Sequence, residues 1–506
     1  MKKRDLYYER IPTKLLREDF RLLGTFLGKV IKDQEGKIFF NIVEKFRLLS
    51  KNTLRDKNKS KIFSKISTEV KKLSPENTFK LTRAFSHILN FLNLAESIDA
   101  SRKLNEYESP YFKNKNQNLF IEDLIEGLFK NKKIPDKKIY EQATKLDIGI
   151  VLTAHPTEVK RRTLIQKYAN LIHILEQRHL YKKYPSKIIE FDRQLYSEIA
   201  IIWKTDELKR TKPSPIDEAR WGLAVIEDSL WDTIPKVYKR LNDIFRKNLK
   251  KDLPRDFNPI QFGSWMGGDR DGNPNVTAEV TKKVLLFSRW QAAKLYDKEL
   301  TKLIQDLSME ECSAKIKKET GNSFEPYRVF LRPIRNKVRL THQLIENHLN
   351  KNSYLDEKKL IQNKYEITLP LREVRNSLKL NREDHIANAD LLDLMRRVRC
   401  FGINLARLDI RQEADRHSKL LNELFKKKYN IKYNLLSEKE KIKLLNKLIK
   451  EKRYFVDRIK ITNKENKEVW NTFKQISKTP HECLGAYVIS MTSTCLLYTS
   501  PSPRDS

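Results

Sequence analysis

The stretch that decides the fold reads Ile148-Gly-Ile-Val-Leu-Thr-Ala-His155-Pro-Thr157-Glu-Val-Lys-Arg161-Arg162-Thr163. It opens with a short β-branched run that stops at a histidine followed by a proline. The residue before a proline is driven towards extended geometry, so we expect His155 at the last extended position of a strand. Thr157 can cap the helix that follows, and the free N–H groups of that helix, with Arg161 and Arg162, would attract an anion. The stretch therefore predicts a strand that delivers a reactive side chain to one edge of a sheet.

The same plan of strand, loop and helix recurs three times further along the chain. Ile260 to Thr277 is a strand followed by a loop, and four of the chain's thirteen glycines fall between Gly263 and Gly272. Arg399 to Glu413 and Ala486 to Met491 are the other two candidate strands. Strands that alternate with helices favour a parallel sheet, and polar residues gathered at strand ends favour a (β/α)8 barrel. Because only about four of the eight strands are visible, the predicted fold is predominantly α with an incomplete (β/α)8 TIM-like barrel.

The first hundred residues carry helical periodicity. Apolar residues from Leu15 to Leu49 recur at helical spacing and predict two helices separated near Gly36. Ser74-Pro-Glu-Asn77 predicts another helix start, since proline suits the first turn. Its expected buried stripe is Leu81, Phe85, Ile88, Leu89 and Leu92. His87 lies in that helix and is interpreted as structural.

Longer helical patterns follow the opening strand, over 164–180, 188–209 and 219–249, and Pro235 should bend the last of them. The charges between Trp203 and Arg220 are interpreted as an ion-pair network in preference to a second anion site. The predicted domains are an N-terminal helical region at 1–145, the first half of the barrel with large helical insertions at 146–494, and an unrelated Ser/Pro tail at 495–506.

Composition narrows the class of protein. The 506 residues include no apolar run that approaches the length of a membrane span. The four cysteines are far apart, without the close pairs typical of zinc or redox sites, which indicates reduced thiols and a cytoplasmic protein. The formal net charge of +36 would suit a polyanion or anionic substrates. However, the lysines are spread along the whole chain and mixed with Asn and Ile, as an AT-rich coding sequence would also produce, so a nucleic-acid partner is not favoured.

The polar residues at the strand ends suggest acid–base chemistry on an anion. Arginine binds phosphate and carboxylate through a planar fork of donors, and histidine can exchange a proton near neutral pH. Together they point to a small phosphorylated or carboxylated metabolite. Asp269 and Asp271 could be metal ligands or could orient Arg270, and two carboxylates on one loop are a weak metal signal.

Several long motifs carry a family resemblance. They are Val151-Leu-Thr-Ala-His-Pro-Thr-Glu158 with Arg161-Arg-Thr163, Ser264-Trp-Met-Gly-Gly-Asp-Arg-Asp-Gly-Asn-Pro-Asn-Val-Thr277, Phe401-Gly402 with Leu408-Asp-Ile-Arg-Gln-Glu413, Trp203-Lys-Thr-Asp-Glu207 and Ala486-Tyr-Val-Ile-Ser-Met491. In this order they resemble phosphoenolpyruvate carboxylase of the bacterial type, from about Glu18 to Thr492.

The resemblance implies carboxylation of phosphoenolpyruvate with bicarbonate to give oxaloacetate and phosphate, with Mg²⁺ or Mn²⁺, in a homo-oligomer expected to be a tetramer. By similarity, His155 would assist proton transfer, Arg411 would hold the phosphate, and Trp265 would wall the pocket. Weaker candidates for anion binding are Arg270, Arg161 and Arg162.

The chain also departs from the family pattern. The family is roughly twice as long, and its second half supplies the acidic metal ligands, a catalytic lysine and a mobile glycine-rich loop. The end of the chain, from Cys495 to Ser506, resembles nothing in the family. We therefore expect a truncated N-terminal half that is inactive alone and prone to aggregate through open strand edges. The alternative is a non-catalytic protein that binds an anion or nucleic acid.

Overall fold

The computed structural model describes residues 14–53, 59–108, 121–131, 133–153, 162–207, 213–254, 256–271, 273–451 and 459–492. The chain divides into two compact units, one made of 1–117 with 158–211 and the other of 118–157 with 212–506. In this grouping, two helices that follow the first strand belong to the same unit as the N-terminal helices. None of the described helices is both long and apolar enough to cross a membrane.

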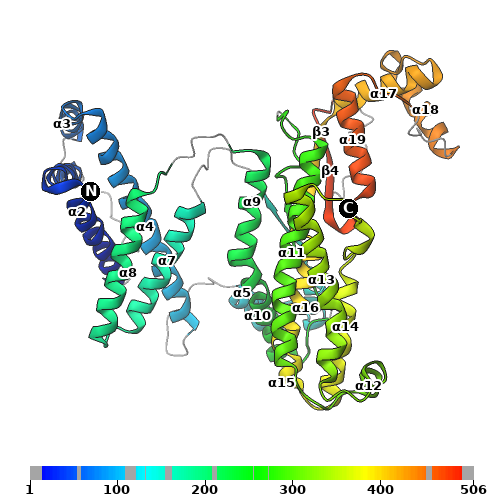
Figure 1. Ribbon diagram of the computed structural model, residues 1–506, viewed down its shortest axis with the longest axis horizontal. Helices are drawn as coiled ribbons and strands as arrows, with labels where there is room; N and C mark the ends of the chain where they lie inside the picture. Colours follow the sequence, from blue (N-terminus) through cyan, green and yellow to red (C-terminus); the bar gives the residue numbers. More distant parts are fainter. Residues whose placement is uncertain are drawn as a thin grey trace. The chain divides into compact units, whose positions relative to one another are not determined.

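The first unit is a set of helices (Figure 1). Its elements are α2 (Lys14–Thr53), α3 (Lys59–Lys71), α4 (Pro75–Glu108), α7 (Arg162–Leu180) and α8 (Pro185–Lys204). The break predicted near Gly36 is confirmed: Gly36 has φ 87° and ψ 166°, so α2 is two helices joined at this residue. The start of α4 at Pro75 is also confirmed.

The core of this unit joins α2, α4, α7 and α8. Its largest fully buried side chains include Leu23, Leu27, Ile31, Phe91, Ile98, Leu171, Leu175 and Trp203. The stripe expected on α4 is wrong at Leu89, which is 61% exposed. The buried face instead runs through Leu81, Ala84 and Phe91 at helical spacing, and Leu89 lies off that face.

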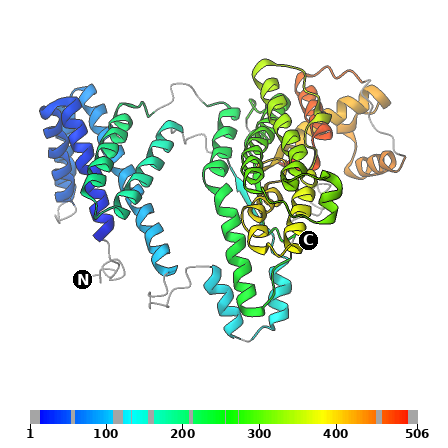
Figure 2. The same ribbon diagram turned by 60° about the horizontal axis from the view of Figure 1, so that its bottom comes forward.

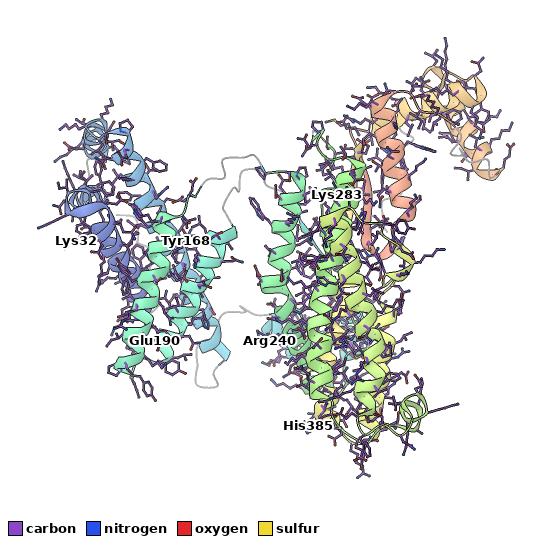
Figure 3. The ribbon with its side chains drawn as sticks, in the orientation of Figure 1. Lys32, Tyr168, Glu190, Arg240, Lys283 and His385 are labelled. Carbon is purple, nitrogen blue, oxygen red and sulfur yellow. The ribbon has the colours of Figure 1, made fainter. Side chains whose placement is uncertain are left out.

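His87 is buried in the first unit among polar partners. Its Nδ1 lies 3.2 Å from the Tyr168 hydroxyl (Tyr168 is labelled in Figure 3), and its Nε2 lies 3.1 Å from Oε1 of Glu207. Burial, with a smaller contribution from nearby Arg83, lowers the pKa of His87 to about 4. A buried neutral histidine that bonds a tyrosine hydroxyl and lies close to a glutamate agrees with the structural interpretation.

The second unit is built on a four-stranded sheet. Its strands are β1 (Ile148–Leu152), β2 (Ile260–Ser264), β3 (Arg407–Glu413) and β4 (Leu484–Ser490), in the order β1-β2-β3-β4. All three pairings are parallel, as predicted. The described residues therefore form a mostly helical protein with a small parallel sheet.

Helices pack along this sheet and on one another. They are α5 (Ile121–Asn131), α6 (Asp136–Ala143), α9 (Pro215–Val225), α10 (Trp231–Leu249), α11 (Ala278–Asp306), α12 (Ala314–Thr320), α13 (Pro326–Lys351), α14 (Tyr365–Leu380), α15 (Asp384–Ala387), α16 (Asp390–Phe401), α17 (Ala414–Tyr429), α18 (Glu438–Lys450) and α19 (Lys464–Lys478), with the short turns η2 (Glu357–Lys359), η3 (Tyr433–Leu435) and η4 (His481–Cys483). The long helices α11, α13 and α14 lie side by side (Figure 1), and α5 packs beside α10 (Figure 2).

Aromatic rings connect the sheet to these helices. Phe401 of α16 stacks on Phe262 of β2 with ring centroids 5.4 Å apart, and on Trp231 of α10 at 5.3 Å. The apolar face of α16 continues the helix to Phe401, so the strand expected from Arg399 begins only at Arg407. The sequence-based boundary was wrong here because an apolar run suits a buried helix as well as a strand.

The helix expected over 219–249 is interrupted by a π-helical turn, η1 (Ile226–Leu230). Pro235 lies inside α10 and has no N–H to offer the carbonyl of Trp231. That carbonyl accepts a hydrogen bond from Nε of Arg397 at 2.9 Å instead. A side chain of α16 thus satisfies the backbone group that the proline leaves free.

Candidate functional site

The loop that follows β2 runs alongside β3. The backbone N–H of Arg270 donates to the carbonyl of Arg411 at 3.1 Å, and the N–H of Arg411 donates to the carbonyl of Gly268 at 3.0 Å. Asp269 and Arg411 form a parallel bridge. The glycine-rich loop therefore continues the sheet pairing beyond the end of β2, which brings its polar side chains to the carboxyl-terminal half of β3.

Trp265 and Arg411 meet at this edge of the sheet. The guanidinium carbon of Arg411 lies 6.0 Å from the centre of the Trp265 ring. The indole N–H of Trp265 donates to Oδ2 of Asp409 at 3.1 Å. An arginine beside a half-buried aromatic face can bind an oxyanion next to a water-poor wall.

Two aspartates of the loop orient Arg411. Its Nη2 lies 2.5 Å from Oδ2 of Asp271, and its Nη1 lies 3.9 Å from Oδ2 of Asp269. The Arg411 side chain is 34% exposed, and its Nε has no hydrogen-bond partner among the described residues. Arg411 is therefore held in place but keeps donor capacity for an anion.

Arg270 lies beneath the loop. It is 4% exposed, and it donates to the Gly268 carbonyl at 3.0 Å and to the Thr281 hydroxyl at 2.6 Å. The Thr281 hydroxyl donates in turn to the Gly267 carbonyl at 2.8 Å. Burial lowers the pKa of Arg270. These contacts fit a residue that braces the loop from inside.

A histidine and a tyrosine pair beside the site. Nδ1 of His417 lies 2.8 Å from the carbonyl of Glu413, which can only accept, so this nitrogen carries the proton. Nε2 then accepts from the Tyr487 hydroxyl at 2.8 Å. Burial lowers the pKa of His417 and raises that of Tyr487 to about 12. Sequence reasoning missed this pair, because nothing in the local pattern of β4 indicates which helix Tyr487 faces.

The other three residues predicted for the site are His155, Arg161 and Arg162. His155 and Arg161 are outside the described residues. Arg162 is the first residue of α7, in the first unit, and its side chain is not described. Of the six residues proposed from the sequence, the structure brings Trp265 and Arg411 together and places Arg270 under the same loop.

The described residues do not by themselves fit a magnesium or manganese site. No group of three or more His, Cys, Asp or Glu side chains able to hold a metal ion occurs among them. Asp269 and Asp271, the two carboxylates considered as ligands, face Arg411 instead, and Oδ1 of Asp269 accepts from the Asp271 N–H at 3.0 Å. Their geometry matches orientation of an arginine, although of Arg411 and not of Arg270.

The second unit is thus an α/β structure: helices pack along a parallel sheet, and an arginine, a tryptophan and aspartates lie at the carboxyl edge of that sheet. Comparison with known proteins narrows this structural class to a family, because residues 16–496 match the phosphoenolpyruvate carboxylase family. The chain belongs to this family, as its motifs indicated.

Curated relatives named phosphoenolpyruvate carboxylase align with this chain over about half of their own length. Phosphoenolpyruvate carboxylase of Acinetobacter baumannii is 38% identical over 484 residues, which cover 94% of this chain and 54% of the relative. The proteins of the same name from Tolumonas auensis and Shewanella oneidensis are 36% and 37% identical, with 94% of this chain and 53% of each relative covered. The chain thus spans about half the length of the curated relatives it matches.

Proposed function

We propose that this chain carries part of the site at which phosphoenolpyruvate is carboxylated to oxaloacetate. The observation that supports this most directly is the Arg411 guanidinium, fixed by Asp271 beside the Trp265 ring at the carboxyl edge of the sheet. Membership of the phosphoenolpyruvate carboxylase family adds the reaction. We propose further that the four parallel strands are half of a (β/α)8 barrel, in line with their order and with the half-length match.

The proposed reaction has two stages. A bicarbonate oxygen attacks the phosphoryl group, and the bond between phosphorus and the enol oxygen breaks, which gives carboxyphosphate and the enolate of pyruvate. Carboxyphosphate then releases carbon dioxide and phosphate, and the enolate carbon bonds to the carbon dioxide. In this scheme Arg411 binds the phosphate and Trp265 keeps water from the enolate, while His155 assists proton transfer at the carboxyphosphate stage.

Further proposals concern the secondary anion-binding arginines, a divalent cation, the oligomeric state and the cellular location. Arg161, Arg162 and Arg270 are secondary candidates for anion binding, and the burial of Arg270 favours a bracing role for it. A divalent cation, Mg²⁺ or Mn²⁺, would neutralise part of the charge of the anionic substrates. A homotetramer and a cytoplasmic location complete the proposal.

Phosphoenolpyruvate binding tests the role of Arg411. Isothermal titration of the chain should show binding, and Arg411→Gln should weaken it by roughly tenfold or more, because a charge-assisted hydrogen bond is lost and Asp271 is left without its partner. Arg240→Gln is the matched control, since Arg240 is an exposed residue of α10 (Figure 3). Equal binding by the Arg411 and Arg240 variants would refute the assignment, and no binding by the unchanged chain would refute the proposed function.

Turnover is tested separately. The chain spans about half of its relatives, so we expect no oxaloacetate when it is supplied with phosphoenolpyruvate, bicarbonate and magnesium. A coupled assay with malate dehydrogenase measures this directly. Clear oxaloacetate formation would show that the residues present suffice for catalysis.

A further inference from the structure

The register between β3 and β4 slips by one residue at Asp409. Leu408 lies opposite Leu484, whereas Ile410 lies opposite Tyr487, so one residue of β3 faces two residues of β4. Such a bulge leaves the ladder locally disrupted and re-aims a side chain. Here the side chain at the bulge is a carboxylate, two residues before Arg411 and on the same face of the strand.

Both oxygens of this carboxylate are engaged by different segments. Oδ1 accepts from the backbone N–H of Ala486 in β4 at 2.8 Å, and Oδ2 accepts from the indole N–H of Trp265 at 3.1 Å. Asp409 is 8% exposed. A buried carboxylate therefore replaces a ladder bond on one side and fixes the aromatic wall of the site on the other.

Two glycines make room for this arrangement. A Cβ on Gly485 would lie 2.0 Å from Oδ1 of Asp409, and a Cβ on Gly268 would lie 2.0 Å from the backbone oxygen of Asp409. Both distances are far below van der Waals contact. The loop after β2 and the strand β4 thus approach Asp409 only because glycine stands at each point of approach.

We propose that Asp409 is a positioning residue, which sets the orientation of the Trp265 ring beside Arg411 by anchoring the indole to the β3–β4 bulge. This inference rests on the proposed function for its catalytic meaning. The orientation of the Trp265 indole by Asp409 does not depend on the proposed function. Asparagine cannot replace Asp409, because the two N–H groups approach different carboxylate oxygens and one of these donors would then face the amide N–H₂ of asparagine.

The orientation of Trp265 can be observed by ¹⁹F NMR of the full chain labelled with 5-fluorotryptophan. Trp265→Phe identifies the Trp265 resonance by its disappearance. Asp409→Asn should shift or broaden that resonance and leave the other tryptophan resonances in place, and it should weaken phosphoenolpyruvate binding roughly tenfold. Asp390→Asn, which changes an exposed aspartate paired with Lys302 on the helix surface, should change neither.

A second variant keeps the test decisive if Asp409→Asn fails to fold. Gly485→Ala leaves both residues of the indole hydrogen bond, Trp265 and Asp409, unsubstituted. Its added Cβ displaces Oδ1 of Asp409, so the same Trp265 resonance should move. An unmoved Trp265 resonance in a folded Asp409 or Gly485 variant would overturn the positioning role. If the resonance moves but the unchanged chain binds no phosphoenolpyruvate, the positioning of Trp265 stands and the proposed function fails.

Discussion

Single side chains in this protein are held by partners distant in the sequence. Arg411 takes its orientation from Asp271, about 140 residues earlier in the chain, and Trp265 takes its own from Asp409. In the first unit His87 of α4 meets Tyr168 of α7 and Glu207 after α8. Burial disfavours the charged form of a side chain such as His87, so its protonation should show in stability.

The titration of His87 predicts acid sensitivity. Its pKa falls to about 4 in the folded state, mainly because the ring is buried, whereas an unfolded histidine has a pKa near 6.5. The unfolded state therefore gains the proton first as pH falls. Stability contributed by neutral His87 is complete above about pH 6.5 and declines towards pH 4, with a loss of about 2 kcal/mol by pH 5.

Urea unfolding at pH 7 and pH 5, followed by circular dichroism, measures this loss. The unchanged chain should lose more stability between the two pH values than His87→Gln does, because glutamine takes up no proton. His179→Gln, at an exposed position of α7, should behave like the unchanged chain. Glu207, 3.1 Å away, would favour the protonated ring, and Arg83 would oppose it. Identical pH dependence in the His87 variant would contradict the prediction.

At the scale of elements, special backbone positions decide how helices and strands join. The break in α2 depends on Gly36, whose φ of 87° and ψ of 166° lie in a region that is essentially restricted to glycine. The β3–β4 bulge likewise depends on Gly485. Periodicity alone predicts the elements on either side but not the angle at which they meet.

A matched pair of glycine substitutions in α2 separates backbone strain from helix propensity. Gly36→Ala should destabilise the chain by roughly 1–3 kcal/mol, because alanine is strained at this φ and ψ. Gly24→Ala should stabilise it by roughly 0.5–1 kcal/mol, because Gly24 lies in a helical turn. Apart from chain neighbours and the helix's own backbone, no heavy atom of the described residues lies within 4 Å of an added Cβ at either site, so steric clash does not confuse the comparison. Urea midpoints of the two variants should move in opposite directions, and a shift in the same direction would contradict this account.

At the scale of the whole molecule, charge and exposed apolar surface act against each other. The net charge of +36 should keep copies apart at low salt. The outer strand β1, however, exposes Ile148 and Ile150 at 41% each. An outer strand with exposed apolar side chains is a surface for association between chains.

Self-association should therefore rise with ionic strength. Light scattering coupled to size exclusion should show larger species at 0.5 M salt than at 0.05 M, because salt screens the repulsion. Ile150→Lys should suppress this increase, whereas Ile38→Lys, at an exposed position of α2 in the first unit, should not. A monodisperse monomer at both salt concentrations would show that β1 does not drive association.

Local sequence patterns correctly predicted much of the secondary structure. The four short apolar runs are strands and pair in parallel, and the helix break at Gly36 and the start at Pro75 lie where the residues indicated. The motifs also identified the family. These features depend on spacing, turn residues and proline geometry, which act within a few residues of the chain.

Tertiary packing determined which apolar residues are buried and which polar side chains pair, and residue spacing could not predict either. Leu89 is exposed and the run from Arg399 ends a helix before it forms a strand, because packing partners determine which apolar residues are buried. Asp409 stood in a motif without an assigned role, and only the approach of β4 and of the loop after β2 shows that it holds Trp265. The sequence by itself determined the four parallel strands, the helix break at Gly36 and the family. The pairings of Trp265 with Asp409 and of Arg411 with Asp271 required the fold, since each joins segments about 140 residues apart and depends on a register that no local pattern contains.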